Sequence, residues 1–308
     1  MLPSRLVEIL RDIENRDVRL QYNRDDNVVF SGENENKYPV IDDVPSIMRL
    51  GPENEEWNAW DMDMVHKIGD SYYKRAKGEL PEKEASKSFA NILRDREIYS
   101  KGDSILDIGC ATGHFLRSFR RVLGPDVIYT GIDSHLDYLL WGSEIYGVDE
   151  TCAFVHSDAL ELPFADKSFD ISIVNLFHFF EDIESALKEL IRVTGRTLLW
   201  RAPVGETNYA TKVIYDNNFE DIGLITPERR DINYTLYMMF SKQYLEGLVK
   251  HLSGKPPMFI AQDTDFEEFD NTALSEFDGL PSTKVVNGMQ INGNLILDWH
   301  YVAIDCSD

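Results

Sequence analysis

Between residues 103 and 203, short apolar runs alternate with longer segments in which apolar residues recur every three or four positions. The short runs predict five strands, at Ser104–Ile108, Val127–Ile132, Ala153–His156, Ile171–Asn175 and Arg196–Arg201. The longer segments predict helices at Phe115–Leu123, Leu136–Ile145 and Ile183–Val193. Because strand, helix and strand repeat at this spacing, we expect an α/β fold with a mostly parallel, doubly wound sheet.

The segments on either side of this region have other patterns. Residues 1–53 predict a small α+β N-terminal extension, with an amphipathic helix from about Leu6 to Ile13 followed by short strands. Residues 54–308 are expected to form the main domain, which begins with a charged helical stretch. After the alternating region we expect a helix at Lys242–Leu252, a strand at Met258–Ala261 and a closing strand at Leu295–Ile304. Two insertions interrupt this part, an aromatic lid at 204–237 and an acidic loop at 263–293.

Charge and composition narrow the function. The 308 residues contain 31 Lys and Arg against 54 Asp and Glu, a net charge of −23. Nucleic acids and anionic membranes are therefore poor candidate partners, because binding them depends on neutralising phosphates. No apolar stretch is long enough to span a bilayer, and the N-terminus lacks the pattern of a signal peptide, so we expect a cytoplasmic protein. The three cysteines lie far apart and HExxH is absent, so we expect no metal site.

The strongest chemical signal is the segment from Ser104 to His114, in which an apolar strand runs into a turn of small residues before a helix. Gly109, Ala111 and Gly113 allow the backbone to approach a ligand closely. Asp107 places a negative charge at the same turn. This charge favours a ligand with an ammonium or sulfonium group over a pyrophosphate.

Two further acidic residues follow later strands. Asp133, before Ser134, stands where a carboxylate can accept both hydroxyls of a ribose, although a dinucleotide dehydrogenase has a similar acid. Asp158 and Ala159 open the segment that continues to Leu-Pro-Phe and Ser-Phe-Asp170. An alternative reading makes Asp158 a helix N-cap.

Together these motifs resemble the class I S-adenosylmethionine-dependent methyltransferase family, in the ubiquinone/menaquinone-biosynthesis-like, type 11 branch. The resemblance covers the alternating region and implies a seven-stranded Rossmann-like sheet with an antiparallel closing strand. It implies S-adenosylmethionine as cofactor, with Asp158 and Ala159 at the adenine. The chain departs from the family at Ala111, where a glycine is usual. The residues that the resemblance implies for the cofactor are Asp107, Gly109, Cys110, Ala111, Gly113, Asp133, Ser134, Asp158, Ala159, Asn175, Leu176 and, in an N-terminal helix, Tyr73.

The resemblance also implies that the segment after the fourth strand lines the methyl-transfer site. His178 matches the first of two histidines common there and is the candidate general base, while Asn175 is the candidate that orients the acceptor or the cofactor. The residues expected to contact the acceptor are Tyr72, Tyr209, Arg229 and Tyr234. Residues 38–48 resemble the end of a zinc-ribbon-like domain found beside such enzymes, here without its cysteines, and an exposed hairpin is the alternative.

Three functions remain open from the sequence. The first is methyl transfer to an oxygen or nitrogen of a small polar acceptor, such as a sugar or a secondary metabolite. The second is a catalytically idle cofactor-binding partner subunit, which the departure at Ala111 leaves room for. The third is a NAD-dependent oxidoreductase, which the absence of GxGxxG and the charge of Asp107 disfavour. A homodimer is an open alternative to a monomer.

Overall fold

The computed structural model describes most of the chain. Its residues are 1–32, 36–49, 62–175, 180, 182–214, 218–226, 228–229, 232, 234–264, 283–286, 289–292 and 295–308, with backbone only at 62–67, 235, 283–286, 290, 292 and 295. None of the helices in these ranges combines the length and the apolarity that crossing a membrane requires.

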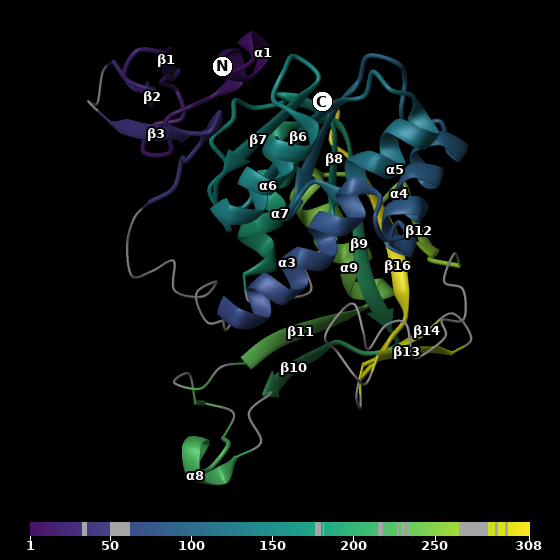
Figure 1. Cartoon of the computed structure of the whole chain (residues 1–308). Coiled ribbons are helices and arrows are strands. Elements are labelled where there is room, and N and C mark those ends of the chain that lie inside the picture. The colour runs from purple at the N-terminus through teal and green to yellow at the C-terminus, as the bar shows by residue number, and fades with distance from the viewer. Residues whose placement is uncertain are drawn as a thin grey trace.

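A central sheet organises the molecule (Figure 1). Seven of its strands lie in the order β7 (Cys152–His156), β6 (Ile128–Asp133), β5 (Ser104–Ile108), β8 (Phe169–Val174), β9 (Thr194–Gly205), β16 (Trp299–Asp305) and β12 (Phe259–Gln262). The end of β11 (Tyr234–Ser241) also pairs parallel with the end of β9 and adds β11 and β10 (Tyr209–Ile214) to the same sheet. The first five run parallel, and β16 pairs antiparallel with both β9 and β12. The predicted α/β fold, with its parallel sheet and antiparallel closing strand, is confirmed.

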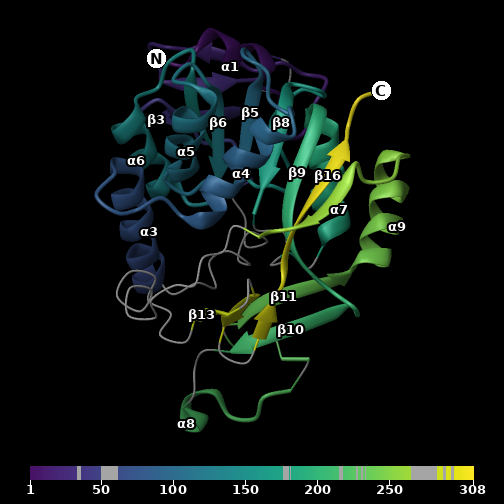
Figure 2. The ribbon, with the colours of Figure 1, turned by 90° about the vertical axis from the view of Figure 1, so that its right-hand side faces the viewer.

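Helices cover both faces of this sheet (Figure 2). The helices are α3 (Met62–Lys77), α4 (Glu84–Asp95), α5 (His114–Leu123), α6 (Leu136–Tyr146), α7 (Ile183–Val193) and α9 (Lys242–Ser253). Alternate residues of a strand pack against the helices on opposite faces of the sheet, because successive side chains of a strand point to opposite faces. Leu198 and Trp200 of β9 pack in the core that contains α7 and α9. Leu199 between them packs in the core that contains α4 and α5.

The N-terminal extension forms its own antiparallel sheet. It comprises α1 (Ser4–Ile9), β1 (Gln21–Asn23), β2 (Val28–Phe30), β3 (Lys37–Ile41) and β4 (Val44–Pro45). The predicted helix was too long, because Leu10 leaves it to form a bridge with Phe164. The segment after β4 covers the free edge of β7, where the Ile47 N–H donates to the His156 carbonyl at 2.8 Å. The zinc-ribbon-like resemblance stays a prediction.

The expected lid at 204–237 contains regular structure. β10 (Tyr209–Ile214) and β11 (Tyr234–Ser241) pair antiparallel, and α8 (Phe219–Ile222) lies between them. We call residues 209–241 the arm. It extends beyond the carboxyl ends of the parallel strands, with α8 at its far tip (Figure 1).

The expected loop at 263–293 is also partly regular. β13 (Thr283–Val286), β14 (Met289–Asn292) and β15 (Leu295–Leu297) form a three-stranded antiparallel sheet. The predicted closing strand is therefore divided at Asp298 into β15 and β16.

Candidate active site

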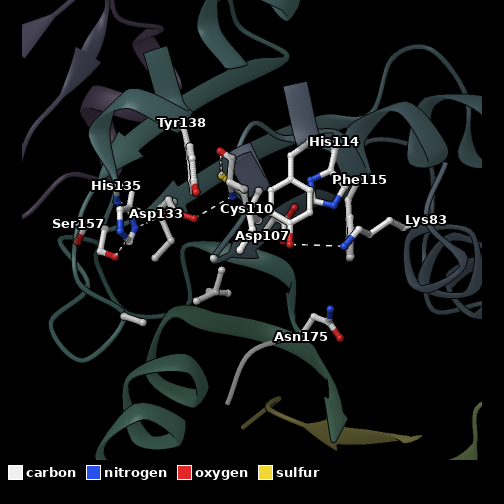
Figure 3. Close-up of a pocket in the computed structure, with 18 of the residues that line it drawn as sticks. Lys83, Asp107, Cys110, His114, Phe115, Asp133, His135, Tyr138, Ser157 and Asn175 are labelled. Carbon is white, nitrogen blue, oxygen red and sulfur yellow. Dashed lines mark hydrogen bonds and ion pairs between the residues drawn. The ribbon is translucent and has the colours of Figure 1, made fainter. Parts of the chain in front are cut away.

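The main pocket lies where the strand order reverses. β5 is hydrogen-bonded to β6 on one side and to β8 on the other, so the connections that follow β5 and β8 leave in opposite directions. Ligands of open α/β sheets bind outside the carboxyl ends of the strands at such a point. The pocket is lined by Ile68, Tyr72, Lys83, Asp107, Ile108, Gly109, Cys110, Ala111, His114, Phe115, Ile132, Asp133, Ser134, His135, Tyr138, Ser157, Ala159, Asn175 and Phe180 (Figure 3).

The small-residue turn after β5 forms the floor of the pocket. Gly109, Ala111 and Gly113 all have positive φ, of 68°, 50° and 69°. Gly109 and Ala111 line the pocket, whereas Gly113 begins helix α5 outside the lining. A Cβ on Gly113 would lie 2.9 Å from the ring of Phe154, so this glycine serves packing.

Asp107 is a buried carboxylate at the end of β5. It is 4% exposed and accepts a hydrogen bond of 2.7 Å from the Tyr129 hydroxyl. Burial raises its pKa to about 7, the Tyr129 hydrogen bond acts in the opposite direction, and the charge of Asp133 adds to the rise. Among the described residues, Asp107 forms no ion pair with a cationic side chain. A cationic group of a ligand would therefore complete this part of the pocket.

Asp133, at the end of β6, holds the turn in place. Its Oδ2 accepts from the Ala111 N–H at 2.8 Å, and its Oδ1 accepts from the His135 N–H at 2.9 Å. Each carboxylate oxygen has a further lone pair, so Asp133 can also accept a hydroxyl of a ligand. Ser134, as expected, lies in the lining beside it.

The segment after β7 contributes Ser157 and Ala159 to the lining, but not Asp158. The Asp158 carboxylate accepts from the Leu160 N–H at 2.8 Å and closes a turn. No helix begins here, so the alternative reading of Asp158 as a helix N-cap is wrong. Burial raises the pKa of Asp158. Its position next to two lining residues leaves the predicted adenine contact untested.

Aromatic residues form the wall opposite the sheet. The Tyr72 ring of α3 lies parallel to the His114 ring at 4.6 Å between centroids, and the Lys83 Nζ lies 4.5 Å from the centre of the Tyr72 ring. Burial lowers the pKa of His114 well below its ordinary value, as do the charges of Lys83 and Arg75, so the imidazole is neutral. Tyr73, which was expected at the cofactor, lies outside the lining and packs against Trp141.

Asn175 follows β8 and lines the pocket as predicted. Leu176 and His178 lie outside the described residues. The predicted base therefore stays a prediction, although Phe180 shows that the same segment returns to the pocket.

The three acceptor residues predicted on the arm do not reach the pocket lining. Tyr209 is 56% exposed, and Arg229 donates to the backbone carbonyls of Ile222 and Leu224 within the arm. The Lys212 Nζ lies over the ring of Tyr234. These contacts stabilise the arm itself.

Sequence reasoning missed several residues of the lining. They are Ile68, Lys83, Ile108, His114, Phe115, Ile132, His135, Tyr138, Ser157 and Phe180. His114 and His135 each follow a predicted ligand turn directly, and this adjacency could have identified them. Lys83 gave no such signal, because it lies on a connection between helices and reaches the pocket only through the fold.

The alternating region matches a known family. Residues 105–196 match the model described as a methyltransferase domain. Residues 105–196 therefore belong to a methyltransferase domain. A demethylmenaquinone methyltransferase of Staphylococcus aureus (strain JH9) is 36% identical over 103 residues, which are 33% of this chain and 42% of that protein. The chain thus spans less than half the length of the curated relatives it matches.

Solved structures align with the methyltransferase domain at low sequence identity. One is the complex of a methyltransferase activator with a methyltransferase from Haloferax volcanii, at a TM-score of 0.45 and 14% identity, covering 78% of this chain and 96% of the other. Another is an N-methyltransferase of Haemonchus contortus with S-adenosylhomocysteine, at a TM-score of 0.47 and 15% identity, covering 72% and 53%. Since both scores lie below 0.5, the fold of the methyltransferase domain rests on its sheet order.

Proposed function

We propose that this chain is an active S-adenosylmethionine-dependent methyltransferase that acts on a small molecule. Asp107 carries the proposal, because it is a buried carboxylate in the pocket with no ion pair to a described cationic side chain. The methionine part of S-adenosylmethionine has an ammonium group that suits this carboxylate. The same charge opposes the pyrophosphate of NAD, so Asp107 weighs against the oxidoreductase alternative.

The rest of the pocket fits the cofactor as well. Asp133 can accept ribose hydroxyls with its free lone pairs, and we assign the adenine to the part of the pocket lined by Ser157 and Ala159. When bound, S-adenosylmethionine supplies a methyl group activated by its sulfonium. The protein's task is then to hold the acceptor at attack distance and to exclude water, for which Ile132 and Phe180 provide apolar surface. We keep His178 as the proposed base.

The pocket lining and one relative's name suggest the class of acceptor. A small polar molecule, such as a sugar or a secondary metabolite methylated on oxygen or nitrogen, suits the few polar groups of the pocket. The name of the Staphylococcus aureus relative adds a quinone-type ring as a candidate.

Calorimetric titration of S-adenosylhomocysteine tests the cofactor. We expect micromolar binding to the wild type and loss of binding in Asp133→Ala. The matched control is Asp126→Ala, which removes an exposed carboxylate and should bind like the wild type. Absence of binding to the wild type would refute the proposal, and NAD would be titrated next. Binding without any methyl transfer across an acceptor panel would favour the idle partner subunit.

A further inference from the structure

A buried ion pair lies directly behind the pocket. The Arg201 Nε of β9 donates to the Asp263 Oδ2 at 2.8 Å, and both side chains are at least 97% buried. Ser88 of α4 donates to the other Asp263 oxygen at 3.1 Å. The guanidinium also lies over the ring of Trp299, at 4.2 Å from its centre. Arg201 is therefore held from several sides.

This pair fixes the orientation of Asn175. The Arg201 NH1 donates to the Asn175 Oδ1 at 3.3 Å. Because a guanidinium has only donors, the amide atom that faces it must be the oxygen. The amide nitrogen is then directed away from Arg201, and Figure 3 shows it on the side of the other pocket residues. Among the described residues, no acceptor is bonded to this nitrogen. The pocket thus has a fixed N–H donor.

A second donor, Lys83, lines the pocket from the wall opposite the sheet. Lys83 lines the pocket with an ammonium group that donates to the Tyr72 hydroxyl at 3.4 Å and, within the described part of the chain, forms no ion pair with a carboxylate. The two carboxylates of the lining, Asp107 and Asp133, are those assigned to the cofactor. Donors without a matching acceptor favour a ligand that brings negative charge.

We propose that the Asn175 amide, fixed by Arg201 and Asp263, binds an oxyanion of the acceptor, such as a phenolate or an enolate oxygen. This inference rests on the proposed function and specifies its acceptor class. Asn175 contacts the acceptor, whereas Arg201 and Asp263 are positioning residues. An acceptor that is bound as an oxyanion has already lost the proton that a general base would otherwise remove.

Two probes of similar shape and opposite charge test the inference, with the protein saturated by S-adenosylhomocysteine. They are 4-nitrophenol, whose phenolate absorbs visible light, and 4-nitrobenzylamine, which is a cation at pH 8. We expect the wild type to prefer the phenolate and to lower the pKa of the bound phenol. In Asn175→Asp, the carboxylate keeps its partner Arg201 but offers the pocket no donor. The preference should then reverse, with phenolate affinity reduced at least tenfold.

A double variant tests the positioning role. Arg201→Met alone would leave Asp263 buried without its partner, so Arg201→Met/Asp263→Leu removes both charges together. The amide of Asn175 is then free to turn, and the ratio of phenolate to amine affinity should fall severalfold toward one. A purely structural role would weaken both probes alike. The control for Asn175→Asp is Asn15→Asp, which adds the same single negative charge at an exposed site in the N-terminal extension.

The remaining outcomes separate this inference from the proposed function. Absence of S-adenosylhomocysteine binding in the wild type would overturn both. Cofactor binding without phenolate preference, or an unchanged preference in Asn175→Asp, would overturn the inference alone. A further titration uses 5′-methylthioadenosine, which lacks the amino acid group. If Asn175→Asp weakened S-adenosylhomocysteine tenfold without affecting this compound, the oxyanion would be the cofactor's own carboxylate, and the acceptor role would be refuted.

Discussion

Replacing Asp107 by asparagine should stabilise the protein and weaken cofactor binding. The buried carboxylate has its pKa raised from 3.8 to about 7, and each pH unit corresponds to about 1.4 kcal/mol. Ionising Asp107 in the folded protein therefore costs about 4 kcal/mol relative to the unfolded chain. Asparagine has no charge to bury, and its Oδ1 can still accept the hydrogen bond from Tyr129.

The sign of the pH dependence follows from the raised pKa. Because folded Asp107 binds its proton more tightly than the unfolded chain does, its stabilising contribution is complete below about pH 4 and is lost as the pH rises to about 7. Asp107→Asn and wild type should have similar free energies of unfolding at pH 4. The difference should grow by about 1.4 kcal/mol per pH unit, to about 4 kcal/mol in favour of the variant at pH 8.

Urea unfolding followed by circular dichroism, at each pH between 4 and 8, measures this difference. Titration of S-adenosylhomocysteine measures the loss of affinity in Asp107→Asn. We expect this loss to be about 10²-fold to 10³-fold at pH 8, which is typical of losing one partner of a buried charge pair. In the wild type, affinity should fall about tenfold per pH unit below pH 7, since binding requires the ionised carboxylate. A stability difference that did not change with pH, or wild-type affinity in the variant, would refute this reasoning.

Three further variants test the packing around the site. Gly69→Ala should lower the free energy of unfolding by about 1–3 kcal/mol and weaken the binding of S-adenosylhomocysteine, because the new Cβ would lie 2.3 Å from the Tyr138 ring and force α3 away. Wild-type values in urea unfolding and in titration would contradict this. Ala111→Gly should stabilise by up to about 1 kcal/mol in the same unfolding assay, since it relieves a φ of 50°, and destabilisation would count against strain there. Ser46→Ala should lower the free energy of unfolding by about 1–2 kcal/mol. The Nε2 of His156 donates to the Ser134 carbonyl, so its Nδ1 is an acceptor and loses its donor when the Ser46 hydroxyl is removed. An unchanged free energy of unfolding would disprove that tautomer.

The sheet and the two carboxylates that line the pocket could be predicted because their signals are local. The run Ser104–Ile108 is apolar and ends in a small-residue turn, and β5 has these bounds. Asp107 and Asp133 each end a predicted strand, and parallel strands bring their carboxyl ends to one edge. No contact between distant residues had to be known.

The remaining parts depend on contacts that the sequence does not reveal. Successive helix positions point about 100° apart, and the sequence does not reveal that Tyr72 faces the pocket while its neighbour Tyr73 packs against Trp141. The arm was predicted as a loop because the pairing of β10 with β11 joins segments about 20 residues apart. Arg201 and Asp263 are 62 positions apart, although a charged residue in the apolar run of β9 signals a buried partner.

The docking of the N-terminal extension has a consequence for synthesis on the ribosome. Leu6 and Leu10 are fully buried, and the neighbouring Ile9 carbonyl accepts from the Ala165 N–H at 2.9 Å. At about 5–20 residues per second, translation from residue 50 to residue 165 lasts roughly 6–23 s, so both leucines stay exposed for that time. Residues 6–10 therefore reach these native contacts only after a segment more than 150 positions further along the chain has been synthesised.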